Sequence, residues 1–336
     1  MNPILEVSDL RVRFRCKGRT QALLTKDPDP FIDAVCGVSF SLNAGETLAL
    51  VGESGAGKTT LARSIIGLAQ VYSGDIRFLG EPVTNLKDAV YKKHRRQMAM
   101  MFQDPVGCLS PRLTVRSLIT EPFKIHGIQR VNERAESGRL LQLVGLSEDF
   151  MDRYPHQLSG GQARRVGIAR ALALSPKLII ADEPTAGLDV SVQGEVLNLL
   201  TSLQRELNIG FLIISHNLSV IRHISDRMAV MYLGRFIEQG ETEKIFDSPR
   251  HPYTAALLSA TPEPDPYARK NRLELNGEIP SLMKRPKGCE FHPRCPWMKD
   301  SCCTDTPPTV TLGDHHQAAC HFPLNASYPT NRFRDA

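Results

Sequence analysis

The residues with the clearest chemistry lie between Gly52 and Thr60, in the sequence GESGAGKTT. Glycines at the first, fourth and sixth positions allow tight turns that point successive backbone N–H groups at one anion. Lys58 can then reach the outer phosphates of a nucleotide, and the hydroxyl of Thr59 can ligate Mg²⁺. An apolar run before the segment and a helical pattern after it are typical of a phosphate-binding loop. The predicted nucleoside triphosphate site comprises Gly52, Glu53, Ser54, Gly55, Ala56, Gly57, Lys58, Thr59 and Thr60.

Four polar residues lie one or two positions after apolar stretches that are typical of buried strands, at Met98–Phe102, Leu178–Ala181 and Phe211–Ile214. The amide oxygen of Gln103 could ligate Mg²⁺ or hold a water, and Asp182 could complete the metal's ligand shell. Glu183 could polarise an attacking water, and His216 follows the last of the three stretches. Taken singly, each of these residues is also common in an ordinary loop. Because ligands bind at the carboxyl ends of parallel strands, we expect the four to gather near the nucleotide.

A second anion site is predicted at Ser159-Gly160-Gly161-Gln162, which follows Leu158 and precedes a helical pattern. Ser159 is a favourable N-cap, and the two glycines leave N–H groups at the helix start exposed. An N-cap with glycines is common in any protein. One nucleotide does not need two primary cradles, however, so the second helix start requires a separate explanation.

Alternating strands and helices are predicted to position these residues, which indicates an α/β fold. The helical pattern from Leu113 to Val144 lacks strand signals, so we expect a helical insertion with Asn132 as an N-cap. A later helix is expected to begin at Ser191 as its cap. Strands are predicted at Leu5–Phe14, Val35–Leu42, Thr47–Val51, Gly74–Phe78 and the three apolar stretches named above.

The composition sets limits on the function. A chain of 336 residues can form one α/β domain and a smaller tail. The net charge of +5 arises from 41 basic and 36 acidic residues without a basic block, so we expect no nucleic-acid partner. Apolar runs are far shorter than the roughly 18 residues of a membrane span, and Glu6 and Asp9 interrupt any signal-peptide pattern. We therefore expect a cytosolic chain that is peripheral to any membrane.

Taken in order, the phosphate loop, Gln103, the LSGGQ segment, Asp182-Glu183, Asp189 and His216 resemble the ATP-binding-cassette (ABC) ATPases. The LSGGQ segment distinguishes ABC ATPases from other phosphate-loop enzymes, because those enzymes lack it. The resemblance covers about residues 5–240. It implies a P-loop NTPase domain over residues 1–260, with an antiparallel β subdomain and a helical subdomain at about 105–175.

The resemblance also implies a head-to-tail dimer and roles for individual residues. Ser159, Gly160, Gly161, Gln162 and Asp189 would face the ATP held by a partner chain, which explains the second anion site. Glu183 would be the general base, and His216 would sense the γ-phosphate. Mg²⁺ would be held through Thr59, Gln103 and Asp182, with Gln103 also linking the metal to a membrane subunit. Phe14 resembles the aromatic that stacks on adenine, and Phe31 is the weaker alternative.

The sequence from Met231 onwards resembles one group within the ABC ATPases. The sequence from MYLGRFIEQG to HPYTAALLSATPEPDP resembles the ATPases of oligopeptide and dipeptide importers. The same group also serves nickel, glutathione and opine uptake, so the solute stays open. Pro262, Pro264 and Pro266 predict a linker. Residues 261–336 are expected to form this linker and a small Cys-rich extension.

Five of the eight cysteines lie between Cys289 and Cys320. Because disulfides are disfavoured in a reducing cytosol, metal coordination by Cys289, Cys295, Cys302 and Cys320 is the better interpretation. Four thiolates suit Zn²⁺ or an iron–sulfur cluster, and unligated thiols are the remaining alternative. Some members of the importer family carry a [4Fe-4S] cluster in this region, and the resemblance to them favours iron over zinc. Cys303 competes with Cys302 as third ligand, and four histidines are possible substitutes: His292, His315, His316 and His321.

The sequence thus predicts an ATP- and Mg²⁺-dependent ATPase subunit of an ABC importer for peptides or a related solute, peripheral on the cytoplasmic face of the cell membrane. Its expected partners are a second ATPase subunit, identical or a paralogue, two transmembrane permease subunits and an extracytoplasmic solute-binding protein. The alternative is a soluble ABC ATPase that acts on nucleic acid or ribosomes. Such proteins usually carry two cassettes or a long coiled-coil insertion, whereas this sequence has one cassette and no heptad run.

Overall fold

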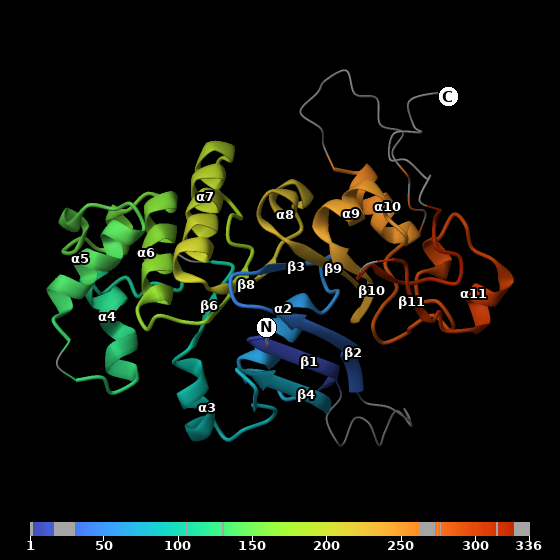
Figure 1. Ribbon diagram of the computed structural model, residues 1–336, viewed down its shortest axis with the longest axis horizontal. Helices are drawn as coiled ribbons and strands as arrows, with labels where there is room; N and C mark the ends of the chain where they lie inside the picture. Colours follow the sequence, from blue (N-terminus) through green and yellow to red (C-terminus); the bar gives the residue numbers. More distant parts are fainter. Residues whose placement is uncertain are drawn as a thin grey trace. The chain divides into compact units, whose positions relative to one another are not determined.

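The computed structural model describes residues 3–16, 31–104, 107–129, 131–261, 273, 275, 277–313 and 315–325 (Figure 1). The chain divides into two compact units, each built from several segments. Unit 1 comprises Met1–Glu6, Ser41–Thr47 and Ile76–Ile214, and unit 2 comprises Val7–Phe40, Leu48–Asp75 and Ser215–Ala336. The predicted proline linker at Pro262, Pro264 and Pro266 lies outside the described residues.

Strands from the first part of the chain form a four-stranded sheet. Its order is β2-β1-β4-β5, and β4 and β5 pair antiparallel with Phe78 opposite Glu81. Inward residues of β1 such as Leu5, Val7 and Leu10 are buried and alternate with more exposed positions, as the sequence pattern predicts. The strands are β1 (Leu5–Arg15), β2 (Phe31–Leu42), β4 (Ser73–Phe78) and β5 (Glu81–Pro82).

Unit 1 contains three parallel strands and most of the helices of the first two-thirds of the chain. In the parallel pairing, Met98 lies opposite Leu178, and Leu178 lies opposite Gly210. Every residue of β7 and β8 is buried, which explains why these stretches are continuously apolar. The elements are α3 (Asp88–Arg95), β6 (Met98–Met101), α4 (Val115–Ile125), α5 (Glu133–Leu143), η1 (Glu148–Phe150), η2 (Pro155–Gln157), α6 (Gly160–Leu172), β7 (Leu178–Asp182), α7 (Val190–Leu207) and β8 (Gly210–Ile214).

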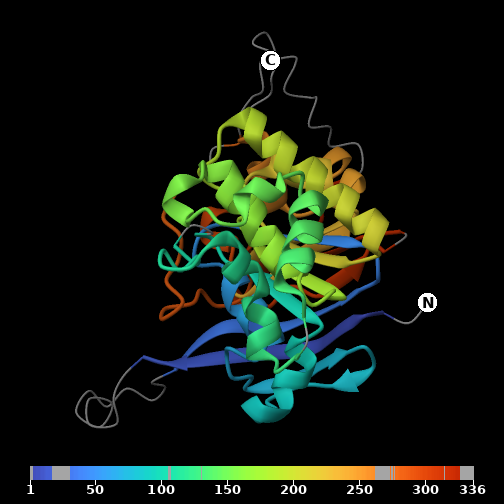
Figure 2. The ribbon, with the colours of Figure 1, turned by 90° about the vertical axis from the view of Figure 1, so that its left-hand side faces the viewer.

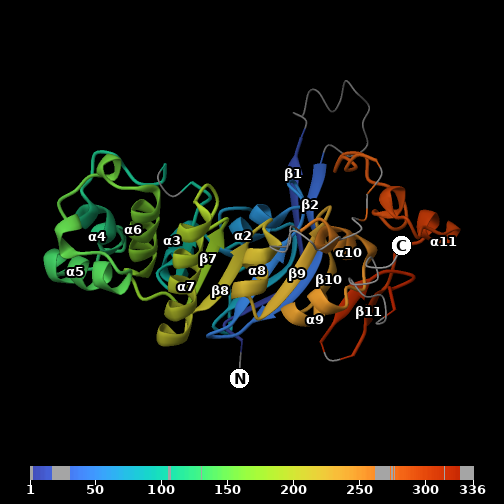
Figure 3. The same ribbon diagram turned by 90° about the horizontal axis from the view of Figure 1, so that it is seen from above.

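The predicted helical insertion is present as α4 and α5, and α6 packs against both (Figures 1 and 3). Figure 2 shows these helices, coloured green, from the side. Asn132 caps α5 as predicted, because its side chain accepts a hydrogen bond from the N–H of Ala135 at 3.1 Å. Leu140, Leu141 and Val144 are fully buried. The helical pattern therefore identified both the cap and the buried face.

The predicted start of α7 was wrong. Asp189, not Ser191, is the N-cap residue, because the Asp189 carbonyl oxygen already accepts the N–H of Gln193 at 2.8 Å. Ser191 is an exposed residue of the first turn. A serine and an aspartate two residues apart are both good cap candidates, and sequence preference alone does not choose between them.

Unit 2 contains β3, which carries the phosphate loop, and the whole described C-terminal extension. Its strands have the order β11-β12-β10-β9-β3, and β3 and β9 are parallel with Leu48 opposite Arg227. The extension adds to this sheet, since Ala318 of β12 lies opposite Glu238 of β10. The elements are β3 (Thr47–Val51), α2 (Lys58–Ile65), α8 (Leu218–Ile224), β9 (Arg227–Tyr232), β10 (Arg235–Glu241), α9 (Thr242–Asp247), α10 (Pro252–Ser259), η3 (His292–Arg294), α11 (Asp300–Thr304), β11 (Thr309–Thr311) and β12 (Gln317–Ala319).

Within the described residues, no helix has both the length and the apolar character that crossing a membrane requires.

Candidate functional site

The predicted phosphate loop connects β3 to α2 in unit 2. Gly52, Gly55 and Gly57 have φ angles of 153°, 80° and 103°. A Cβ at Gly52 would lie 2.2 Å from the carbonyl oxygen of Met231, and one at Gly57 would lie 2.3 Å from that of Ala34. At Gly55 no heavy atom lies within 4 Å of the Cβ position, so this side of the loop has room for a ligand. The loop therefore has the glycine-dependent turns that the sequence predicts.

Lys58 is the first residue of α2, and its side chain turns back over the loop. Its Nζ donates to the carbonyl oxygens of Gly52 at 2.7 Å and Glu53 at 2.9 Å. The residue is buried, so its ammonium group has little access to bulk solvent. The position of this charge therefore depends on where the backbone of residues 52 and 53 lies.

His216 belongs to unit 2 and is exposed. The preceding Ser215 is buried, and its N–H donates to the carbonyl oxygen of Leu50 in β3 at 3.3 Å. The N–H of Asn217 donates to the Ser215 hydroxyl at 3.1 Å, and the Asn217 side chain caps α8. Within unit 2, the turn that carries His216 is thus attached to the strand that leads into the phosphate loop.

Asp182 and Glu183 lie at the end of β7 in unit 1, and Asp182 is buried. Glu183 has a φ of 52°, which is unusual for a residue with a side chain. Its N–H donates to the carbonyl oxygen of Ile214 at 2.9 Å, so the neighbouring strand β8 holds this turn. Such a backbone conformation costs on the order of 1–3 kcal/mol and persists only where the surroundings impose it. The strain is located at the predicted general base.

Arg164 of α6 is the second group that holds this turn. Its Nη1 donates to the carbonyl oxygen of Glu183 at 3.2 Å and to that of Pro184, and Nη2 donates to that of Ala186 at 2.8 Å. Burial lowers the pKa of the Arg164 guanidinium, and the charge of Asp104 acts against this shift. The sequence analysis missed Arg164. No motif or periodic pattern in the sequence marked this residue, because α6 has no distinct apolar face and residue 165 is also an arginine.

The LSGGQ helix start caps itself. The Ser159 hydroxyl accepts the N–H of Gln162 at 3.3 Å, and the Gln162 side-chain oxygen accepts the N–H of Ser159 at 3.0 Å. This capping box confirms Ser159 as the N-cap residue of α6. Ser159 and Gly160 are nevertheless exposed. Two end groups of the helix are thus satisfied internally, while its first turn stays open to solvent.

Gln103 and Asp189 are exposed residues of unit 1. Gln103 follows β6, and Asp189 precedes α7 without a hydrogen bond from its side chain to the helix start. Val190, next to Asp189, is 85% exposed, which is unusual for a large apolar residue. Phe14 and Phe31 lie in unit 2 and are 46% and 45% exposed. The role of each of these residues in ATP binding stays a prediction.

The four predicted cysteine ligands affect one another. Burial raises the pKa of the Cys320 thiol to about 12, with a further upward influence from Cys289, Cys295 and Cys302. Burial likewise raises the pKa of Cys295 to about 11, with Cys289 and Cys302 acting in the same direction. Cys302 is buried, whereas the Sγ of the more exposed Cys303 lies 3.8 Å from the Sδ of Met298.

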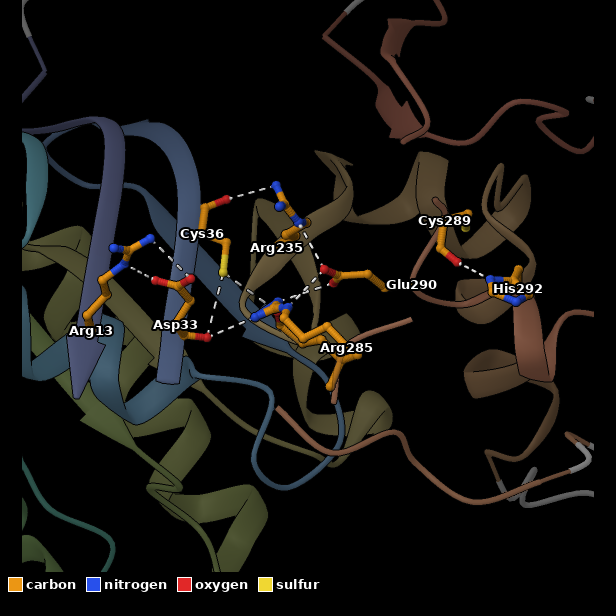
Figure 4. A network of polar contacts seen from close by, with 9 residues as sticks. Arg13, Asp33, Cys36, Arg235, Arg285, Cys289, Glu290 and His292 are labelled. Atoms are coloured by element: carbon orange, nitrogen blue, oxygen red, sulfur yellow. Dashed lines mark hydrogen bonds and ion pairs between the residues drawn. The ribbon is translucent and has the colours of Figure 1, made fainter. Parts of the chain in front are cut away.

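Three of the four histidines considered as substitutes have other partners. His316 Nε2 lies 2.7 Å from Oε1 of Glu238. His292 Nδ1 lies 2.9 Å from the carbonyl oxygen of Cys289, as Figure 4 shows. His321 Nε2 lies 2.8 Å from the carbonyl oxygen of Asp305. As the described side chains lie, no group of three or more His, Cys, Asp or Glu residues is arranged to hold a metal ion. The metal centre therefore stays a prediction.

Sequence comparisons assign both parts of the chain to known families. Residues 35–186 match the family described as ABC transporter, and residues 237–302 match the C-terminal region of oligopeptide/dipeptide transporters. The oligopeptide transport ATP-binding protein AppF of Bacillus subtilis is 47% identical, over 95% of this chain and 97% of AppF. The oligopeptide transport ATP-binding protein OppF of Escherichia coli is 44% identical, over 94% of this chain and 95% of OppF.

Solved structures show the same cassette. The dimeric ATP-binding cassette MJ0796, in a post-hydrolysis state bound to ADP and Pi, has a TM-score of 0.62 and 26% identity, covering 71% of this chain and 98% of MJ0796. CbiO1 of Clostridium perfringens, part of the ABC transporter complex cbiONQ, has a TM-score of 0.62 and 30% identity, covering 73% of this chain and 91% of cbiO1. The predicted P-loop NTPase fold and ATPase activity are confirmed. With the motifs and the C-terminal region in agreement, the chain belongs to the ATP-hydrolysing subunits of ABC transporters, in the oligopeptide/dipeptide transporter family.

Proposed function

We propose that this protein energises the import of peptides, by closing with a second ATPase subunit around two Mg-ATP molecules. The names of AppF and OppF and the match at residues 237–302 support peptides as the solute class. We further propose that it works at the cytoplasmic face of the membrane with two permease subunits and an extracytoplasmic binding protein. The alternative function on nucleic acid or ribosomes has no support from AppF or OppF, since both are transport proteins by name.

The exposed LSGGQ helix start is the observation that carries the dimer proposal. Its capping box is complete, yet Ser159 and Gly160 face solvent, and an anion there would meet backbone N–H groups and the positive end of α6. In the proposed dimer, that anion is the γ-phosphate of ATP bound to the partner's phosphate loop. Gly161, Gln162 and Asp189 would face the same ATP. The exposure of Val190 beside Asp189 supports an interface on this face of unit 1.

In the proposed mechanism, the chain's own residues bind the nucleotide and activate water. The phosphate loop and Lys58 hold the phosphates. Thr59, Gln103 and Asp182 would each supply an oxygen ligand to Mg²⁺, and the ion would supply positive charge that offsets the charge of the phosphates. Glu183 accepts a proton from the water that attacks the γ-phosphorus, the bond between that phosphorus and the bridging oxygen of ADP breaks, and ADP and phosphate are the products. His216 contacts the γ-phosphate. The support for Glu183 is its position in a strained turn that Ile214 and Arg164 hold in place.

A groove in unit 1 supports a docking site for a permease. Its volume is about 410 Å³, and it follows β6 towards Phe102, the residue before Gln103. Apolar side chains including Met98, Met100 and Phe102 line it together with Arg170. We propose that a short cytoplasmic helix of a permease binds here, so that movement of the permease reaches Gln103. Cross-linking of single cysteines at this groove to a co-expressed permease would test the contact.

We also propose a [4Fe-4S] cluster, with Zn²⁺ as the alternative, held by Cys289, Cys295, Cys302 and Cys320. The other three thiols raise the pKa of Cys320, and Cys289 and Cys302 raise that of Cys295, so the proposed ligands are close enough to interact. Burial raises the pKa of Cys289, Cys295 and Cys320, and backbone N–H groups that donate to these sulfurs act against that shift; the donors include Phe291 for Cys289, Trp297 for Cys295 and Phe322 for Cys320. Such hydrogen bonds stabilise thiolates. When bound, the group would cross-link the loops of the extension.

Purified protein tests the metal proposal directly. A cluster predicts visible absorbance near ~400 nm and bound iron, with loss of both in Cys302→Ser but not in the matched variant Cys303→Ser. Colourless protein with stoichiometric zinc would select the alternative. Protein with neither metal would contradict both.

The function itself is tested in membranes. The chain co-expressed with its permeases is expected to fractionate with the membrane and to hydrolyse ATP in response to a peptide-loaded binding protein. The Glu183→Gln variant should retain ATP and form a stable dimer without turnover. Release into the soluble fraction despite the permeases, or stimulation by nucleic acid instead, would contradict the proposal.

A further inference from the structure

We propose that the C-terminal extension positions the phosphate loop for nucleotide binding, through Arg294 and Tyr253 acting on Glu53. All three residues belong to unit 2, although Tyr253 lies 200 positions and Arg294 lies 241 positions after Glu53 in the sequence. The inference rests on the proposed ATP contacts of residues 52–60. It adds residues outside the nucleotide-binding motifs to the machinery of ATP binding.

Arg294 forms a two-pronged ion pair with the second residue of the phosphate loop. Its Nη1 donates to Oε2 of Glu53 at 2.9 Å, and its Nη2 donates to Oε1 at 3.0 Å. This geometry fixes the orientation of the carboxylate as well as its distance. The side chains of Arg294 and Glu53 are 7% and 24% exposed, so the pair is largely shielded from solvent. Removal of Arg294 would leave the Glu53 carboxylate without its charge partner in a largely shielded position, which costs more than the loss of an exposed salt bridge.

Tyr253 holds the backbone of the same residue. The N–H of Glu53 donates to the Tyr253 hydroxyl at 3.0 Å. Tyr253 lies in the first turn of α10, where its own N–H donates to Nδ1 of His251 at 3.0 Å. Glu53 is therefore held at two points, with its side chain bound by Arg294 and its main chain bound by Tyr253.

A packed aromatic cluster keeps the two anchors in place. The rings of Tyr232 and Tyr253 lie 4.9 Å apart, and each lies 5.5 Å from the ring of Phe291. Tyr253 and Phe291 are among the largest fully buried side chains. Phe291 directly precedes η3, which contains Arg294. The anchor on Glu53 thus extends from the core of unit 2 rather than from a free surface loop.

Glu53 in turn positions the charge that meets the phosphates. Its carbonyl oxygen accepts a hydrogen bond from Lys58 Nζ at 2.9 Å. A displacement of Glu53 would therefore move both the loop backbone and the lysine ammonium. Because electrostatic binding depends on the geometry of preorganised groups, small displacements here weaken phosphate binding.

A separate polar network joins Arg285 and Glu290 of the extension to Asp33 of β2 (Figure 4). Arg285 Nε donates to Oε1 of Glu290 at 2.9 Å, and Arg285 also donates to the carbonyl oxygens of Asp33 and Leu233. The residue after Leu233 is Gly234, whose N–H donates to the carbonyl oxygen of Ala56 in the phosphate loop at 2.9 Å. The extension is therefore attached near both Glu53 and Ala56.

The test measures the dissociation constant of the full-length chain for Mg-ATP by calorimetry. Arg294→Ala is expected to weaken binding roughly ten-fold, within the range typical of coupling between sites. Arg222→Ala is the matched control, because Arg222 makes a two-pronged pair with Glu243 that is exposed and involves no loop residue. Thermal stability and metal content are measured for each variant, so that a folding defect or loss of a bound metal is detected separately.

Milder variants keep the proposal testable if Arg294→Ala does not fold. Arg294→Lys keeps the charge but loses the fork, and Tyr253→Phe loses only the hydroxyl; each is expected to weaken Mg-ATP binding about two- to five-fold. Arg294→Ala should have no further effect in a Glu53→Ala background, because the two residues act as one unit. Normal affinity in Arg294→Ala, or full additivity in the double variant, would overturn the proposal.

Lys58→Ala separates failure of this inference from failure of the proposed ATP site. Loss of Mg-ATP binding in Lys58→Ala with normal binding in Arg294→Ala would reject the positioning role alone. Normal binding in Lys58→Ala would reject the phosphate loop as the site, and the inference with it.

Discussion

The two anion-binding helix starts of this protein are supported in different ways. The phosphate loop in unit 2 is held from outside, because Tyr253, Arg294 and Gly234 all bond to its residues. The LSGGQ start in unit 1 is held by its own capping box between Ser159 and Gln162. Both segments are glycine-rich and precede helices. The conformation of the phosphate loop depends on residues far away in the sequence, whereas the LSGGQ start is held by hydrogen bonds between its own residues.

The difference matches what each site has to do. A site that binds its own nucleotide must be rigid before the ligand arrives, since ordering a loop on binding lowers affinity. A site that meets a ligand on another chain must instead remain accessible, and Ser159 and Gly160 are exposed. Changes at the two sites should therefore have separable effects on nucleotide binding and on dimer formation.

The largest expected effect is on the rate of ATP hydrolysis when Glu183 of unit 1 is changed. Glu183→Gln should lower ATP turnover on the order of 1000-fold, because the general base is lost while the shape of the side chain is kept. Steady-state ATPase assays measure this, and binding of Mg-ATP should be unchanged. Glu206→Gln, at an exposed position of α7, is the control. Turnover near that of the unaltered protein would remove Glu183 from its proposed role.

The next effect sharpens the contrast within unit 1. Arg164→Lys should lower turnover about 100-fold, because one ammonium cannot donate to the carbonyl oxygens of Glu183, Pro184 and Ala186 together. Mg-ATP affinity of the chain should stay normal, unlike in Arg294→Ala. A similar loss of affinity in both variants would show that the two sites are not separable in this way.

A smaller effect is expected at the signature. Ser159→Ala should lower turnover about ten-fold and weaken nucleotide-dependent dimer formation, measured by light scattering with Mg-ATP in a Glu183→Gln background. Loss of the N-cap should also cost about 1 kcal/mol of helix stability. Ser147→Ala provides a control, because Ser147 caps the short helix η1 in the same unit. Dimers as stable as without the substitution would argue against a phosphate contact at Ser159.

The smallest effect concerns the scaffold behind the phosphate loop. Burial lowers the pKa of His251 to about 3 from 6.5, so the neutral form is the one that the fold accommodates. Two titratable groups lie near His251. Oε2 of Glu238 accepts a hydrogen bond from the backbone N–H of His251 at 2.9 Å, and His316 is bound to Glu238. Because the unfolded chain takes up the proton first, stability is present above pH 6.5 and is lost as the pH falls towards about 3.

That loss should amount to about 1.4 kcal/mol per pH unit below 6.5. His251→Asn, which keeps an acceptor for the N–H of Tyr253, should remove this part of the slope. Urea unfolding of both proteins between pH 7 and pH 5 measures the difference. Equal slopes would show that His251 does not titrate on unfolding.

Much of the site was predictable because it depends on local chemistry. At Gly52 and Gly57 a Cβ would collide with a backbone carbonyl oxygen. Asp182 ends a strand with no exposed residue, and Glu183 follows it. Such constraints act on neighbouring residues and are visible as motifs. Arg164 and Arg294 were not predictable, since each binds groups at least 19 positions away in the sequence and neither belongs to a periodic pattern.

The sequence by itself determined the ABC ATPase family, the strands that lead into the predicted site residues, and the residue types at both anion sites. The tertiary structure decided how these sites are held: by a C-terminal extension that reaches Glu53, and by an arginine of the signature helix that reaches the Glu183 turn. The physical reason is how far apart in the sequence the interacting residues lie. Caps, glycine turns and strand ends depend on residues a few positions apart, whereas a buried ion pair between Arg294 and Glu53 exists only after the chain has folded.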